Sequence, residues 1–126
     1  MDARLKDILD RLELAEGRDD AVLHATLAFL EDIKFAPGLA EPVRPESINT
    51  SDAAIHLIDL VAPGWSIHIA GRAQERDGHW RCTLRSSSSR DNDEFIGIGK
   101  GKVLLHALLA ALLRTESFLA GQRQIS

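Results

Sequence analysis

A glycine-punctuated apolar stretch near the C-terminus constrains this chain more than any other feature. Residues 95–114 read FIGIGKGKVLLHALLAALLR, which predicts a short strand that continues through glycines into a helix from about Gly101 to about Leu119. Between Val103 and Leu113 the only polar residue is His106. A helix with so little polar surface must be covered nearly all round. One sheet face cannot do this alone, so other helices or a second copy must contribute.

Two amphipathic helices are predicted at the N-terminus, within residues 1–35. The apolar positions of the first, over residues 2–16, repeat at i, i+3, i+4 and i+7, at Leu5, Ile8, Leu9 and Leu12. The second is capped by Asp19 or Asp20 and extends to about Ile33. The short joint around Gly17 predicts an antiparallel helical hairpin. Its apolar stripes must be buried against the rest of the chain or against a second copy.

Residues 36–49 are predicted to be a linker, because Pro37, Gly38, Pro42 and Pro45 occur too densely for a regular helix or central strand. The linker leads to a main domain over residues 50–120. Residues 121–126 are expected to form a frayed tail.

The main domain begins with a helix that is capped within residues 49–52 and ends at about Leu60, before Pro63-Gly64. Alternating apolar and polar residues then predict strands over Trp65–Arg72 and His79–Ser86, and a third strand covers Phe95–Ile98. Asp77-Gly78 is a hairpin turn signal, and residues 86–93 form a polar loop.

The predicted fold class is therefore α+β, with an α-β-β-β-α core around a three-stranded antiparallel meander. Trp65, Trp80 and Cys82 would point inward, and Cys82 is interpreted as an inert core thiol. The opposite face would carry His68, Arg72, Arg81, Thr83 and Arg85. That face is either solvated or covered by the acidic N-terminal hairpin, and the second arrangement would make an α/β/α layered sandwich.

Composition limits the class of protein. The chain has 126 residues, 44% of them hydrophobic and 27% charged, which suits one globular domain with a single core. No window is apolar enough for a membrane span, no secretory signal is evident, and the single cysteine cannot form an internal disulfide. These features predict a cytoplasmic protein. The net charge of −4 argues against bulk nucleic-acid binding, although residues 63–126 alone are basic.

Residue patterns do not indicate catalysis, a cofactor or a metal. Gly97, Gly99 and Gly101 precede a helix, but the spacing fits neither a Rossmann fingerprint nor a Walker loop, and glycine also lets a strand approach a helix closely. The five histidines lack the spacing of a zinc helix, and the run of serines in residues 86–89 lacks a nucleophile elbow. We expect no catalytic residues, no cofactor and no metal site, and we expect that the protein is not an enzyme.

The order of elements resembles that of double-stranded-RNA-binding domains. Their third strand and last helix read approximately G-x-G-x-S-K-K-x-A-K. Gly97 and Gly99 fall on the two glycines and Lys102 on the first lysine, whereas Val103 and His106 replace the other two lysines. In that family these lysines contact phosphates across the RNA groove.

The alternative interpretation that builds on this resemblance is a nucleic-acid contact made by Lys100, Lys102 and His79 together with the strand arginines Arg81 and Arg85. Losing two of the three family lysines would remove most of the salt-dependent affinity. RNA or DNA binding is therefore the alternative interpretation.

A more extensive resemblance is to small phage and prophage proteins with the phage ABA sandwich domain. The similar segments are Leu9–Gly17, Thr50–Ala54, Pro63-Gly64-Trp65 and the helix Leu104–Arg114. The chain departs from that family at Gly101-Lys102, where Thr-Pro is common, and in its longer loop at residues 86–93. The resemblance implies an α/β/α layered fold and a phage or mobile-element origin, and it implies no catalytic residues.

The sequence therefore favours a small non-enzymatic phage-type protein that acts by binding a macromolecule. A protein partner is favoured over nucleic acid, and the unpaired amphipathic helices would also suit a homodimer.

Overall fold

The computed structural model describes residues 3–32, 44–71, 79–85 and 96–125, with side chains of the last helix described as far as Leu119. The helices are α1 (Ala3–Leu14), α2 (Asp20–Asp32), α3 (Pro45–Ile48), α4 (Ser51–Val61) and α5 (Leu104–Ile125). The strands are β1 (Ser66–Gly71), β2 (Trp80–Arg85) and β3 (Ile96–Gly101). The predicted turn at Asp77-Gly78, the polar loop 86–93, and Arg72, Pro37, Gly38 and Pro42 lie outside these residues.

The three strands form one antiparallel sheet in the order β1-β2-β3, which confirms the predicted meander and the α+β class. Alternation along β2 decides which face is buried. Cys82 and Leu84 are fully buried and face the helices, and Trp65, Ile67 and Trp80 pack beside them against the core. The residues between them therefore point to the opposite, outer face of the sheet.

Helix α5 is the centre of the molecule, as its composition predicts. Every residue from Leu105 to Leu113 is buried. The covering comes from several elements, because β2 and β3 lie against α5 on one side and α1 and α4 pack on it from others. The all-round burial explains why a sequence with almost no polar side can be stable in this helix.

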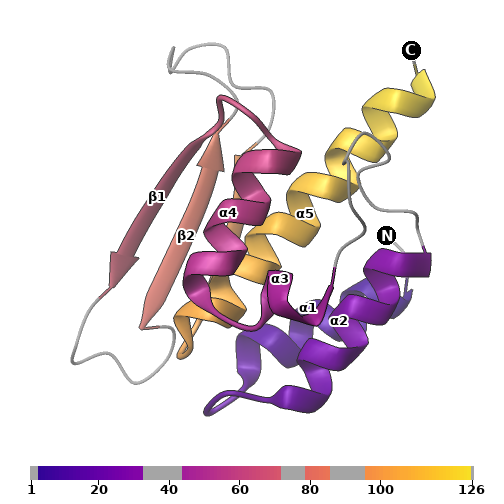
Figure 1. Cartoon of the computed structure of the whole chain (residues 1–126). Coiled ribbons are helices and arrows are strands. Elements are labelled where there is room, and N and C mark those ends of the chain that lie inside the picture. The colour runs from indigo at the N-terminus through magenta and orange to yellow at the C-terminus, as the bar shows by residue number, and fades with distance from the viewer. Residues whose placement is uncertain (1–2, 33–43, 72–78, 86–95, 126) are drawn as a thin grey trace.

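The N-terminal hairpin packs on α5 and reaches the β3 strand, rather than crossing the outer face of the sheet. Its buried residues include the predicted stripe of Leu5, Ile8, Leu9 and Leu12. In Figure 1 the layers run from the sheet, through α4 and α5, to α1 and α2. Of the two arrangements left open by the sequence, the one with an acidic hairpin over the arginine-bearing face is therefore not observed.

Three predicted boundaries were wrong. The third strand continues through Gly101, because Gly101 still pairs with Trp80 of β2. The helix therefore begins later than predicted, and the Ala107 N–H donates its first backbone hydrogen bond to the Val103 carbonyl. Helix α5 continues to Ile125, since a single glycine at position 121 costs a helix only ~1 kcal/mol relative to alanine. The predicted frayed tail over residues 121–126 is thus helical as far as Ile125.

The third correction concerns residues 36–49, which were expected to lack helix. Residues 45–48 form the single turn α3, and Ile48 is buried. Pro45 is compatible with that turn because it occupies the first helical position, where no backbone N–H is needed.

Candidate functional site

The register of the sheet brings residues from all three strands together on the outer face. Three cross-strand rows follow from the pairing: Ala70–Arg81–Lys100, His68–Thr83–Ile98 and Ser66–Arg85–Ile96. We call this set the outer face. None of the described helices lies over it, because the helices pack on the side that carries Cys82 and Leu84.

The outer face is basic although the whole chain is acidic. Its cations are Arg81, Arg85 and Lys100, and the described strands contain no aspartate or glutamate, against a net charge of −4 for the chain. Its apolar part is Ile96, which is 39% exposed, with Ile98 half-buried next to it. Cations that border an exposed and a half-buried isoleucine make a surface suited to an acidic partner with an apolar contact of its own.

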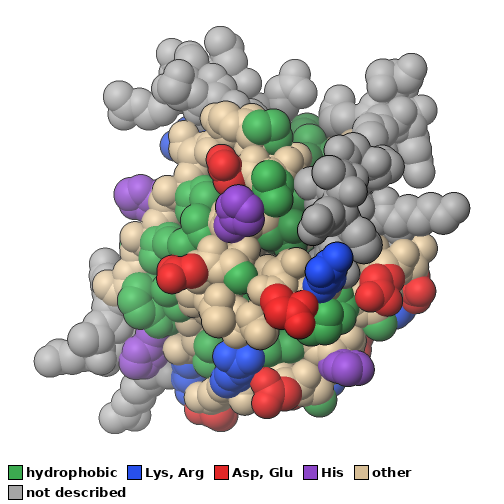
Figure 2. Space-filling view, in the orientation of Figure 1, with side chains coloured by type: hydrophobic (Ala, Val, Ile, Leu, Met, Phe, Trp, Pro, Cys, Tyr) green, Lys and Arg blue, Asp and Glu red, His purple; other side chains and the backbone are tan. Residues whose placement is uncertain are grey.

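On the helical side of the molecule, neither basic nor acidic side chains predominate. Figure 2 shows acidic, basic and histidine side chains interspersed among apolar ones on the face that carries α4. A hollow of about 310 Å³ lies between α3 and α4, where its lining includes Arg44, Glu46 and the exposed Leu60. One cation and one anion in this lining give it no preference for the charge of a ligand.

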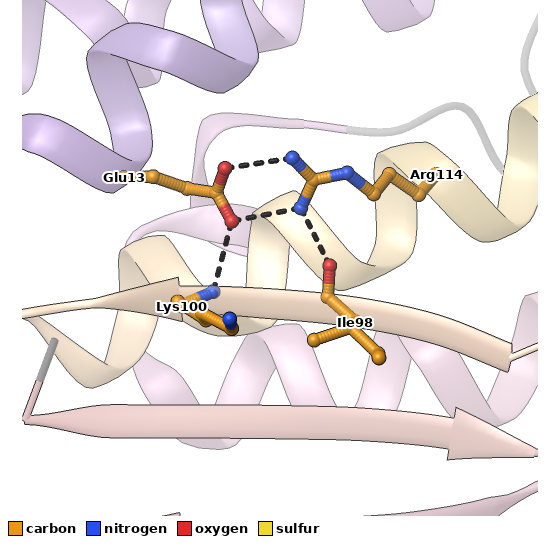
Figure 3. Close-up of polar contacts among 4 residues, drawn as sticks. All are labelled: Glu13, Ile98, Lys100 and Arg114. Atoms are coloured by element: carbon orange, nitrogen blue, oxygen red, sulfur yellow. Dashed lines mark hydrogen bonds and ion pairs between the residues drawn. The ribbon is translucent and has the colours of Figure 1, made fainter.

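An ion pair between α1 and α5 closes the free edge of β3 beside the outer face. Glu13 and Arg114 form a two-pronged pair in which both guanidinium N–H groups donate to carboxylate oxygens at 2.7 Å. The same two side chains bind the strand backbone. The Lys100 N–H donates to Glu13 at 3.0 Å, and Arg114 donates to the Ile98 carbonyl at 2.5 Å, as Figure 3 shows.

This pair is a structural feature that sequence reasoning missed. Glu13 and Arg114 are partly buried, with 20% and 31% of their side-chain surfaces exposed. Hydrogen bonding to Glu13 raises the pKa of Arg114, so the cation is held charged. Together with Ile96, Ile98 and Lys100 the pair lines a hollow of about 330 Å³ at this rim of the outer face.

The residues predicted to contact nucleic acid do not form one cluster. Arg81 and Lys100 are direct cross-strand neighbours, and Arg85 lies on the same face. Lys102 is instead half-buried just before α5 and forms an ion pair with Glu16 of the α1–α2 joint, at 2.5 Å. His79 is half-buried at the residue before β2. The lysine that matches the RNA-binding pattern thus faces the α1–α2 joint and has a carboxylate partner there.

His106 forms a second polar site, buried inside the molecule. Its Nε2 accepts the Asp19 N–H at 3.2 Å, and its Nδ1 lies 3.1 Å from the Leu12 carbonyl. Because a carbonyl can only accept, Nδ1 must carry the proton and the ring is neutral. Burial lowers the pKa of His106, while the Leu12 hydrogen bond and the Asp19 charge oppose that shift.

This arrangement makes His106 a buried core residue with both ring nitrogens hydrogen-bonded. Its ring joins the end of α1 to the residue before α2, and so it fixes the hairpin to α5. Helical spacing could show that the side chain is buried, but not which backbone groups it would meet.

The remaining candidates have structural explanations. A methyl group at Gly99 would lie 2.0 Å from the Ala107 carbonyl oxygen, so the glycine allows β3 to touch α5. Burial raises the pKa of the Cys82 thiol to about 11, which keeps it protonated and unreactive. Within the described ranges, no three side chains among His, Cys, Asp and Glu are grouped as a metal ion would require.

No protein-family model, no curated protein and no solved structure matches this chain. In the part of the chain that the structure describes, none of the helices combines the length and the apolar character that crossing a bilayer requires. The fold and the outer face together define an α+β protein with one basic sheet face over which none of the described helices lies.

Proposed function

We propose that this chain is a non-enzymatic binding protein that holds an acidic segment of a protein partner on the outer face. The sequence resembles small phage and prophage proteins, and that resemblance implies no catalytic residues. The observation that carries the proposal is the row Ala70–Arg81–Lys100 near the exposed Ile96 and the half-buried Ile98, with all described helices on the other side of the sheet.

The chemistry of the outer face favours a protein over a nucleic acid. Phosphate backbones are bound mainly by cations, and the affinity depends on how many phosphates are neutralised. Here Lys102 pairs with Glu16 away from the outer face, and the outer face carries isoleucine beside its cations Arg81, Arg85 and Lys100. An acidic peptide with apolar side chains satisfies both parts of that surface, whereas a phosphate backbone satisfies only the cations.

A pull-down from a bacterial lysate with variants tests this proposal. Arg81→Glu reverses a charge on the middle strand of the outer face, and Lys6→Glu reverses a charge on an exposed part of α1 as a matched control. We expect a captured protein to be retained by wild type and Lys6→Glu. Its affinity for Arg81→Glu should fall about tenfold, which corresponds to ~1.4 kcal/mol. Equal retention by all three proteins would contradict binding at the outer face.

A gel shift separates the alternative. If duplex RNA binds at ~50 mM salt, loses affinity steeply at higher salt and depends on Arg81, the partner is a nucleic acid and the protein-binding proposal is wrong. The protein-binding proposal would also be contradicted if the wild type captured no protein in the pull-down.

A further inference from the structure

The two edges of the sheet differ, and the difference has consequences for assembly. Edge strands expose unpaired backbone groups that can pair with another chain, and proteins usually protect them with charges, proline or a covering element. The β3 edge is protected, because Glu13 occupies the Lys100 N–H and Arg114 occupies the Ile98 carbonyl. At the β1 edge, no described residue plays this part.

The hydrogen bonds at the β3 edge determine which backbone groups of β1 point away from the sheet. Since Ile98 and Lys100 direct their backbone groups away from β2, their partners Thr83 and Arg81 direct theirs toward β1. The opposite residues of β1 are His68 and Ala70, and their backbone groups therefore face β2. The intervening residues, Ile67, Ile69 and Gly71, present their N–H and C=O groups to the outside.

The strand itself has none of the usual protection. Its sequence is SIHIAG, without lysine, arginine, aspartate, glutamate or proline. Ile69 is 37% exposed. Two such strands can therefore approach each other without charge repulsion, which does not hold for the basic outer face. An uncharged edge that no described element covers is stable in solution when another strand pairs with it.

We propose that the β1 edge binds the β1 edge of a second copy of this chain, in antiparallel register centred on Ile69. This register places Ile69 opposite Ile69 of the second copy and Ile67 opposite Gly71, so that all three outward residues are paired. A register centred on His68 would place Gly71 opposite Trp65, whose N–H is already bonded to the Ala62 carbonyl. The product is a continuous six-stranded sheet.

The assembly stops at two copies. Pairing through β1 on both sides is symmetric and consumes both open edges, and the outermost strands are then the two capped β3 strands. The proposal concerns the edge of the sheet and does not depend on what the outer face binds.

Light scattering after size exclusion, over a series of protein concentrations, tests the proposal on the full chain. We expect a dimer for wild type. Ile69→Lys places two lysines opposite each other at the two-fold axis and should weaken dimerisation at least tenfold. Ile96→Lys is the matched control, since Ile96 has nearly the same exposure, 39%, but lies on β3. It should leave the dimer intact, whereas it would weaken binding at the outer face.

Hydrogen exchange of the wild type gives a readout that does not require any variant to fold. The amides of Ile67, Ile69 and Gly71 should exchange more slowly as protein concentration rises, while those of His68 and Ala70, bonded to β2, should not change. A wild-type monomer at all concentrations, an Ile69→Lys dimer of unchanged strength, or concentration-independent exchange at Ile69 would each overturn the proposal.

Discussion

His106 shows how a single residue couples separate helices. Its neutral ring donates to the end of α1 and accepts from the residue before α2, so both nitrogens are used. Protonation would place an N–H donor on Nε2 against the Asp19 N–H, and that hydrogen bond would be lost. The folded state therefore requires the neutral ring.

We predict that the protein loses stability as the pH falls below about 7, through the ordinary histidine pKa of 6.5. The pKa of His106 is lowered from 6.5 in the folded state, so below pH 6.5 the unfolded chain binds a proton that the folded chain does not. The nearby charges of Asp19 and Arg18 act in opposite directions on that pKa. The free energy of unfolding keeps falling until the pH reaches the pKa that His106 has in the folded state, by up to ~1.4 kcal/mol per pH unit.

Urea unfolding at several pH values measures this slope. His106→Gln, which can still donate and accept a hydrogen bond but does not titrate, should show a flatter dependence over the same range. An identical slope in both proteins would assign the effect to other groups.

Gly99 allows the closest approach of β3 to α5. A methyl group there would lie 2.6 Å from the Ala111 nitrogen as well as 2.0 Å from the Ala107 carbonyl oxygen, and helix backbone cannot yield as a flexible side chain can. Gly99→Ala should therefore destabilise the fold by ~1–3 kcal/mol in urea titration. Gly17→Ala is the control, because a Cβ at Gly17 meets nothing within 4 Å, and it should change stability by less than ~0.5 kcal/mol.

At the scale of elements, the Glu13–Arg114 pair holds α1, α5 and the edge of β3 together. Its side chains are partly buried, whereas the Arg4–Asp32 pair between α1 and α2 has 45% and 62% of its side-chain surfaces exposed. Exposed pairs are screened by water and contribute little, while removing one partner of a shielded pair leaves the other charge poorly solvated.

We predict that Glu13→Gln lowers the free energy of unfolding by ~1–3 kcal/mol, and that Asp32→Asn lowers it by less than ~1 kcal/mol. Thermal unfolding of the two variants beside the wild type checks the difference. If the two losses are equal, the edge pair is no more than an ordinary surface contact.

The elements themselves could largely be predicted from sequence, because their signals are local. The stripe of Leu5, Ile8, Leu9 and Leu12 identified the buried face of α1, and alternation along β2 identified Cys82 as buried. The composition of α5 also predicted its all-round burial. Boundaries were less accurate, as at Gly101, because pairing with β2 outweighs the local preference for a helix start.

The polar contacts that fix these elements to each other could not be predicted. Glu13 and Arg114 are 101 positions apart, and both look like ordinary solvated helix residues in the sequence. The partners of His106 are a backbone carbonyl and an N–H near the α1–α2 joint, which carry no sequence signal. Strand alternation predicted which residues form the outer face. Whether a helix lies over that face depends on where the hairpin packs, which the sequence does not indicate.

At the scale of the whole molecule, the sequence predicts two units, a hairpin over residues 1–35 and a domain over residues 50–120. The packing instead joins the hairpin to the domain. Leu12 is fully buried, and α1 lies directly on α5. We therefore predict one cooperative unfolding transition. Fluorescence of Trp65 and Trp80 reports on the sheet region, and far-ultraviolet circular dichroism reports mainly on the helices, so the two curves should coincide. Separate midpoints would show that the hairpin unfolds independently.

The arrangement of layers also fixes where the chain ends lie. In Figure 1 both marked ends are on the helical side, away from β1 and β2. A surface tether or a fluorescent fusion attached at either end would consequently leave the sheet side turned toward the solution, and immobilised protein should retain the accessibility of that side.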